Sequence, residues 1–68
     1  ESDPAALMLK VIQTLPLRQR QVLVLRQWHG FSIEETAKLL KIGEGSVKSH
    51  LSRAIEAVKE RLKDEGGL

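Results

Sequence analysis

The sequence contains no cysteine and no tyrosine, and it has a single tryptophan and a single phenylalanine among its 68 residues. Without cysteine, disulfide bonds and cysteine-ligated zinc or iron–sulfur sites are excluded. Two aromatic residues offer few platforms for stacking single-stranded bases. The longest aliphatic run, residues 22–25, is far shorter than the ~18 apolar residues that a spanning helix needs. A signal peptide is also missing, so the sequence predicts a cytoplasmic protein that has no membrane partner.

The composition is that of a small folded domain, with 41% hydrophobic and 29% charged residues. We expect residues 1–68 to form one domain. The formal net charge is only +2, but the charges are unevenly distributed. Residues 17–29 contain three arginines and no acidic residue, and cations outnumber acids in residues 44–63. Charges in these numbers are typical of solvent-exposed helix faces, so they do not by themselves indicate a nucleic-acid partner. Only their positions on the helices can do so.

The apolar spacing predicts an all-α chain of four helices and no strand. Asp3 and Pro4 begin a helix over 4–14, and Pro16 ends it and opens a second helix over 17–28. Gly30 is a left-handed stop. Ser32 and Glu35 form a capping box that begins the third helix. The fourth helix is expected to begin at 45 or 46 and to run to about 64, with Gly66 and Gly67 beyond it. Its expected apolar stripe is formed by Val47, Leu51, Ala54, Ile55, Val58 and Leu62.

The last two predicted helices have the spacing of a helix-turn-helix, although a generic pair of antiparallel helices is the alternative. Ala37 is small enough for the helices to approach, and Ile42 and Val47 would fill the angle between them. The opposite face of the fourth helix is small, hydroxylated and basic in its first half. In a helix-turn-helix this face enters the major groove of DNA.

Three segments together resemble region 4 of bacterial RNA polymerase sigma factors, and most closely the extracytoplasmic-function (ECF) group of the sigma-70 family. They are residues 15–23 (LPLRQRQVL), 30–37 (GFSIEETA) and 45–54 (GSVKSHLSRA), and the resemblance covers roughly residues 5–63. It implies a compact four-helix domain with a helix-turn-helix, winged-helix-like but without a wing. Residues 1–30 would be region 4.1, and residues 31–64 would be region 4.2.

The resemblance also implies a function and its partners. The family recognises the minus-35 promoter element in duplex DNA and holds the flap of the polymerase β subunit. We expect both partners here, and an anti-sigma factor that competes for the same surface. No cofactor and no metal are expected.

Carried over residue by residue, the resemblance predicts three sets of site residues. The DNA-binding set is Gly45, Ser46, Lys48, Ser49, Ser52 and Arg53, with base edges assigned to Ser49, Ser52 and Arg53, a base or phosphate to Lys48, and a phosphate to Gly45 and Ser46. A weaker set for the DNA backbone is Arg18, Arg20 and Arg26. A hydrophobic groove for the protein partner is predicted at Met8, Leu9 and Leu23, whose alternative role is to fill the core.

The sequence departs from the family pattern at three positions. Lys41 stands where a helix-turn-helix often has glycine, so a non-glycine residue carries the strained turn. Gly43 stands where the family often has serine, which weakens the cap of the recognition helix. His50 replaces a commonly basic residue and lowers the charge beside the DNA groove.

Other function classes compete with this interpretation. The DNA-binding domain of LuxR-type response regulators is the main alternative, because residues 47–53 fit that family too. A helical adaptor that binds only protein is a second alternative. An enzyme is the weakest class, since His29 and His50 belong to different predicted elements. Ser49 and His50 project about 100° apart on a helix and cannot act as a nucleophile and its base. We therefore predict no catalytic residue.

Overall fold

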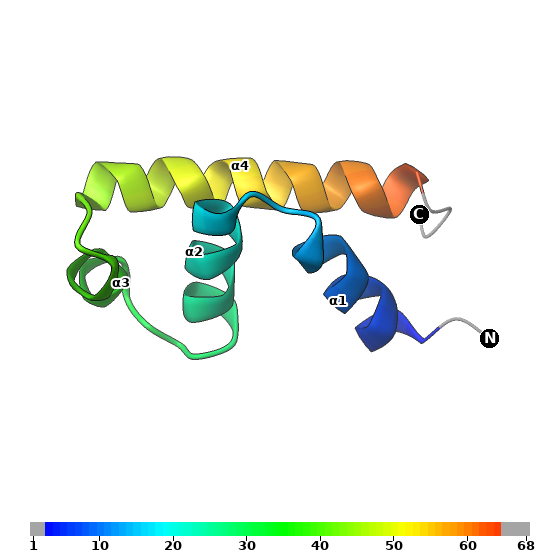
Figure 1. Ribbon diagram of the computed structural model, residues 1–68, viewed down its shortest axis with the longest axis horizontal. Coiled ribbons are helices and arrows are strands. Elements are labelled where there is room, and N and C mark those ends of the chain that lie inside the picture. The colour runs from blue at the N-terminus through cyan, green and yellow to red at the C-terminus, as the bar shows by residue number, and fades with distance from the viewer. Residues whose placement is uncertain (1–2, 65–68) are drawn as a thin grey trace.

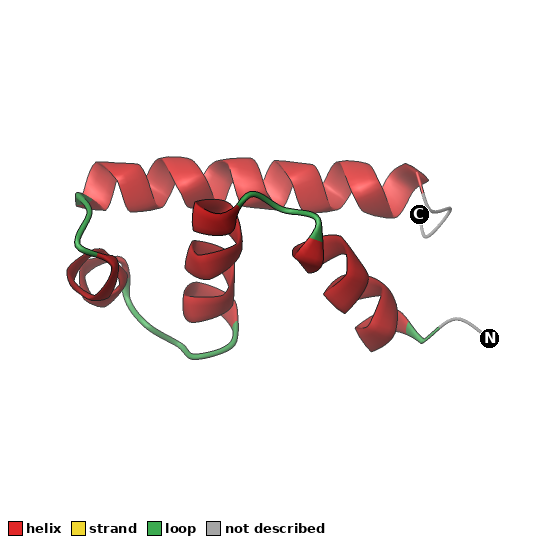
Figure 2. Ribbon diagram, in the orientation of Figure 1, coloured by secondary structure: helices red, strands yellow, loops and turns green. Residues whose placement is uncertain are grey.

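The structure is a computed structural model that describes residues 3–64, and within that range it contains four helices and no strand (Figures 1 and 2). The helices are α1 (Pro4–Gln13), α2 (Leu17–Gln27), α3 (Ile33–Leu40) and α4 (Glu44–Asp64). The predicted all-α fold is confirmed. The expected helix ends agree to within a residue or two, and α4 begins at Glu44 rather than at 45 or 46. Gly66 and Gly67 lie outside the described residues.

The long helix α4 forms one side of the molecule, and the three shorter helices pack against its other side (Figure 1). α1 contacts the C-terminal half of α4, α3 lies near its N-terminal end, and α2 crosses it between them. The side chains that meet along α4 form two buried clusters. One contains Ile12, Leu15, Leu23 and Ala54, and the other contains Val22, Ala37 and Val47. Leu51 packs against both clusters and joins them into one core.

The apolar stripe of α4 is narrower than its sequence suggested. Val47 and Ala54 are completely buried, but Ile55, expected in the stripe, is 37% exposed. A rotation of 100° per residue carries Ile55 from Ala54 to the edge of the buried face. Ile55 therefore lies at the edge of the expected stripe and not in the core, and its side chain is left at the surface between α2 and α4.

The start of α3 is held by the predicted capping box. The Glu35 N–H donates to Ser32 Oγ at 3.0 Å, and the Ser32 N–H donates to Glu35 Oε1 at 2.8 Å. Two orphan backbone donors are thereby satisfied reciprocally. The buried Thr36 hydroxyl donates to Ser32 O at 2.8 Å. Burial of this polar side chain in the core therefore leaves no hydroxyl unpaired.

The turn between α3 and α4 contains the left-handed residue that the sequence predicted at Lys41 (φ 59°, ψ 47°). The next N–H, of Ile42, donates to Ala37 O at 3.0 Å, and that of Lys41 donates to Lys38 O at 3.3 Å. This pair of bonds is a Schellman motif, which ends a helix and reverses the chain. Ile42 then packs on the cluster of Val22, Ala37 and Val47. The turn and the core together set the angle at which α4 leaves α3.

Candidate DNA-binding and partner surfaces

The first half of α4 is oriented by Val47, which is completely buried against α2 and α3. Because Val47 points into the core, the opposite side of α4 faces solvent. The six predicted DNA-binding residues all lie on α4 and are all exposed: Gly45, Ser46, Lys48, Ser49, Ser52 and Arg53. The structure therefore brings this set together on one accessible stretch of about two and a half helical turns.

The chemistry of this stretch suits a phosphate-bearing groove. Gly45 has no side chain, and a Cβ placed there would meet nothing within 4 Å, so the helix can approach a ligand closely. Serine hydroxyls both donate and accept hydrogen bonds. Arg53 presents a fork of donors that matches guanine or phosphate. Free N–H groups and the positive end of the dipole at the helix start also favour an anion.

One acidic residue also lies at this surface, at the start of the helix. Glu44 is the first residue of α4 and is exposed. Its carboxylate stabilises the helix start through the dipole, but it repels any phosphate that approaches the same N–H groups. A negative residue in the first turn is visible in the sequence, so its effect could have been predicted once the helix was known to begin at Glu44.

The three arginines of α2 differ in their surroundings, although all are half-buried. Arg26 Nη1 donates to Phe31 O at 2.6 Å, and its Nε is buried without a partner among the described residues. Arg26 thus ties the end of α2 to the loop before α3. Arg18 Nη1 donates to Gln21 Oε1 at 3.0 Å on its own helix. A role for Arg18, Arg20 or Arg26 at the DNA backbone stays a prediction.

His50 lies at the border between the buried and exposed sides of α4. It is half-buried, and its Nδ1 is enclosed without a hydrogen-bond partner among residues 3–64. His29 lies within the α2–α3 loop and packs edge-on against Phe31, with ring centroids 6.3 Å apart. Across the described part of the chain, no three His, Asp or Glu side chains are grouped to hold a metal ion. No helix there is both long and apolar enough to cross a bilayer.

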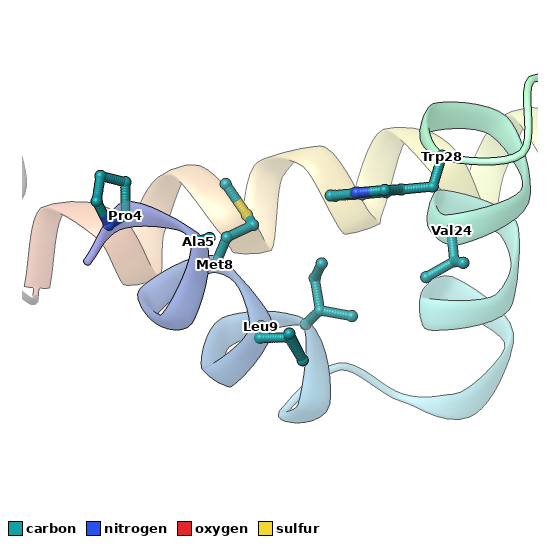
Figure 3. A pocket seen from close by; sticks show the side chains of 7 residues that line it. Pro4, Ala5, Met8, Leu9, Val24 and Trp28 are labelled. Carbon is teal, nitrogen blue, oxygen red and sulfur yellow. The ribbon is translucent and has the colours of Figure 1, made fainter.

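A second surface lies at the other end of the molecule, where α1, α2 and α4 leave two apolar hollows. The first, of about 520 Å³, is lined by Pro4, Ala5, Met8, Leu9, Ile12, Val24 and Trp28 (Figure 3). The second, of about 340 Å³, is lined by Met8, Leu23, Gln27, Trp28, Ile55, Val58 and Lys59. We call the two together the apolar groove. Met8 and Trp28 line both hollows, which are therefore neighbours.

The predicted partner residues all line this groove, but not equally. Met8 lines both hollows, and Leu9 lines the first with 56% of its surface exposed. Leu23 lines the second hollow but is only 6% exposed and belongs to the core. Sequence reasoning did not assign Trp28, which is 59% exposed and extends from the end of α2 toward α1 (Figure 3). The sequence did offer one indication of an exposed role: this single tryptophan stands two residues before Gly30, where the helix was expected to end.

Comparison with protein families gives a match over most of the chain. The family model described as "Sigma-70, region 4" matches residues 5–58, a range that includes the first half of α4 and all of the residues lining the apolar groove except Pro4 and Lys59. This match favours the sigma-factor resemblance over the LuxR-type alternative.

Curated proteins with similar sequences point the same way. The RNA polymerase sigma-E factor of Streptomyces coelicolor is 46% identical over 57 residues, which cover 84% of this chain and 32% of that protein. The ECF RNA polymerase sigma factor SigD of Mycobacterium tuberculosis is 38% identical over 65 residues, which cover 96% of this chain and 29% of that protein. SigM of the same species is 40% identical over 45 residues, or 66% of this chain and 23% of that protein. The chain thus spans about a third or less of these relatives' length.

Proposed function

This chain belongs to the sigma-70 region 4 family, and on that basis we propose that it binds promoter DNA during transcription initiation, with α4 in the major groove at the minus-35 element. Its activity is binding rather than catalysis, and its place of action is the cytoplasm. Residues 1–30 act as region 4.1, and residues 31–64 act as the helix-turn-helix of region 4.2. The observation that supports this best is the exposed, serine-rich and basic side of α4, held outward by the buried Val47.

Each residue of that side has a role in the proposal. Ser49, Ser52 and Arg53 contact base edges, and Arg53 makes the most discriminating contact because its guanidinium can bind guanine with two bonds. Lys48 contacts a base or phosphate from the flank of the helix. Gly45 and Ser46 bring backbone N–H groups to a phosphate, and these contacts position the helix without reading sequence.

The apolar groove is the proposed docking surface for the flap of the polymerase β subunit, and an anti-sigma factor competes for it. Leu9 and Trp28 support this role, because each exposes more than half of its surface beside a hollow lined almost entirely by apolar side chains. Exposed apolar patches of this kind mark protein-interaction sites. Met8 and Leu23 support the groove from beneath and also stabilise the core.

The DNA proposal is tested by fluorescence polarisation with duplexes selected from a random pool, measured at low and high salt. A domain that neutralises several phosphates loses affinity steeply as salt rises, with a logarithmic slope of about −0.9 per phosphate. We expect such a slope and a preference for the selected sequence over a scrambled duplex. Lys48→Ala should reduce the slope, whereas Lys63→Ala, which removes a cation from the far end of α4, should not. An absence of binding at both salt concentrations would instead support the adaptor alternative.

A further inference from the structure

One side chain of α4, next to the proposed DNA side, has a buried nitrogen that the fold leaves unpaired. His50 Nδ1 is enclosed and has no hydrogen-bond partner among residues 3–64, although the side chain as a whole is only half-buried. We propose that His50 binds a DNA phosphate as an uncharged hydrogen-bond donor, through its Nε2–H, on the wall of the major groove opposite to Lys48. This inference rests on the proposed DNA-binding function and adds one contact residue and the form in which it acts.

The unpaired Nδ1 decides which nitrogen of the ring carries the proton. A neutral imidazole has one N–H donor and one acceptor nitrogen. A proton on Nδ1 would be an enclosed donor without an acceptor, and orphaned buried N–H groups are rarer in folded proteins than acceptors that lack a partner. The proton is therefore on Nε2. That nitrogen is not among the enclosed, unpaired atoms of residues 3–64, so its N–H is accessible to a ligand.

The helix places His50 and Lys48 on opposite flanks of its exposed side. Ser49 is turned about 160° from the buried Val47 and thus lies near the centre of that side. Lys48 and His50 are each turned about 100° from Ser49, in opposite directions. A helix in the major groove lies between two phosphate strands. With Ser49 facing the bases, one flank faces each phosphate strand.

The surroundings of His50 on the surface of α4 favour an anion. Its neighbours on the same flank are Ser46, four residues before it, and Arg53, three residues after it. Both are exposed, and both carry hydrogen-bond donors. The acidic residues Glu44 and Glu56, six residues away on either side, are each turned about 120° from His50. A phosphate that reaches this flank therefore meets three donors before it meets a carboxylate of α4.

An uncharged donor has a signature that separates it from a cation. The salt dependence of DNA affinity follows the number of phosphates that cations neutralise, with a logarithmic slope of about −0.9 for each. A neutral Nε2–H neutralises none, so removing it should lower the affinity and leave the slope unchanged. Removing Lys48 should change both.

The test compares His50→Asn with His50→Gln in the 68-residue chain, at pH 8, where histidine is ordinarily uncharged. The amide of glutamine can place an N–H near the position of Nε2, whereas the shorter asparagine places its amide near that of Nδ1. Polarisation with the selected duplex should show about three- to tenfold weaker binding for His50→Asn and a change of less than about twofold for His50→Gln. His50→Arg is the charged control and should steepen the salt slope by about 0.9.

Further measurements locate the contact. Long-range proton–nitrogen correlation spectra of the unchanged chain should show the ring proton on Nε2, and the duplex should shift its resonance to lower field. In duplexes with single methylphosphonate substitutions, one position should weaken the unchanged chain but not weaken His50→Asn any further. Because a phosphate contact reads no sequence, His50→Asn should weaken binding to the selected and the scrambled duplex equally. Circular dichroism checks that each variant is folded.

Several results would overturn the proposal. They are a ring proton on Nδ1, a proton resonance that the duplex does not move, a changed salt slope in His50→Asn, or a loss confined to the selected duplex. If the unchanged chain binds duplexes with the expected salt slope and His50→Asn binds equally well, the role of His50 is refuted and the proposed function stands. If the unchanged chain binds no duplex, the proposed function fails and the contact fails with it.

Discussion

The left-handed backbone at Lys41 and Gly30 allows a quantitative test of how backbone conformation contributes to the free energy of unfolding. Lys41 has φ 59° and Gly30 has φ 71°. For a residue with a side chain, this conformation costs about 1–2 kcal/mol. Lys41→Gly removes that strain but adds about 0.5–1 kcal/mol of unfolded-chain entropy. We expect a net gain of about 0.5–1 kcal/mol in the free energy of unfolding, or a rise of roughly 2–8 °C in Tm for a domain of this size.

Gly30→Ala is the reciprocal change and should destabilise by a similar amount, about 0.5–1 kcal/mol. A Cβ at Gly30 would meet nothing within 4 Å, so the cost is one of backbone conformation and not of a clash. Gly45→Ala is the matched control, because Gly45 is equally open but lies within α4 and has no positive φ. There the same substitution should stabilise, by about 0.5–1 kcal/mol.

The assay is urea unfolding followed by circular dichroism. The slope of the unfolding free energy against urea concentration should be equal among the variants. Because the two positions lie in separate loops and share no bond in the structure, the changes at Lys41 and Gly30 should add in the double variant. The reasoning is refuted if Gly30→Ala and Gly45→Ala shift the midpoint in the same direction. A loss of stability in Lys41→Gly would refute it as well.

Three further outcomes are expected from single substitutions. Arg53→Ala should weaken binding to the selected duplex by about 1–3 kcal/mol and relax specificity at one base position; an equal loss on every duplex would make Arg53 a phosphate contact. Leu9→Glu should abolish binding to a purified polymerase β-flap fragment. The Tm should stay within a few degrees of that of the unchanged chain, since Leu9 is 56% exposed, and a large fall in Tm would show that Leu9 belongs to the core. Ala54→Leu should destabilise the domain by about 1–3 kcal/mol, because Ala54 is completely buried where α4 meets α1 and α2. Thermal unfolding followed by circular dichroism measures this, and an unchanged Tm would contradict it.

The local structure of the chain was predictable because its signals act over a few residues. The capping box of Ser32 and Glu35, the left-handed Gly30 and the turn at Lys41 depend on short-range hydrogen bonds and on backbone sterics. Apolar spacing was also enough to place Val47 and Ala54 inside. These features predict where α4 begins and which side of it is buried, but they fit a generic antiparallel helix pair as well as a helix-turn-helix, and the resemblance to region 4 decided between the two.

What could not be predicted depends on how helices meet. Ile55 fits the stripe of α4, yet it is exposed because none of the helices within residues 3–64 covers that edge. The contact of Arg26 with Phe31 O joins residues whose proximity depends on the path of the α2–α3 loop. Trp28 looked like one more apolar residue of α2. Its place in both hollows follows from the packing of α1 against α4, which no spacing within α2 can reveal.

The continuity of α4 has a consequence for promoter geometry. Ser49, on the proposed DNA side, and Val58, in the groove, belong to one unbroken helix, and nine residues separate them by about 13 Å along its axis. A displacement of the recognised sequence by one base pair moves and turns the domain by about 3.4 Å and 35°. A partner held in the groove would have to follow that screw motion, since an unbroken helix has no joint to absorb it. In the proposed complex, tolerance for variable promoter spacing would therefore reside outside residues 44–64.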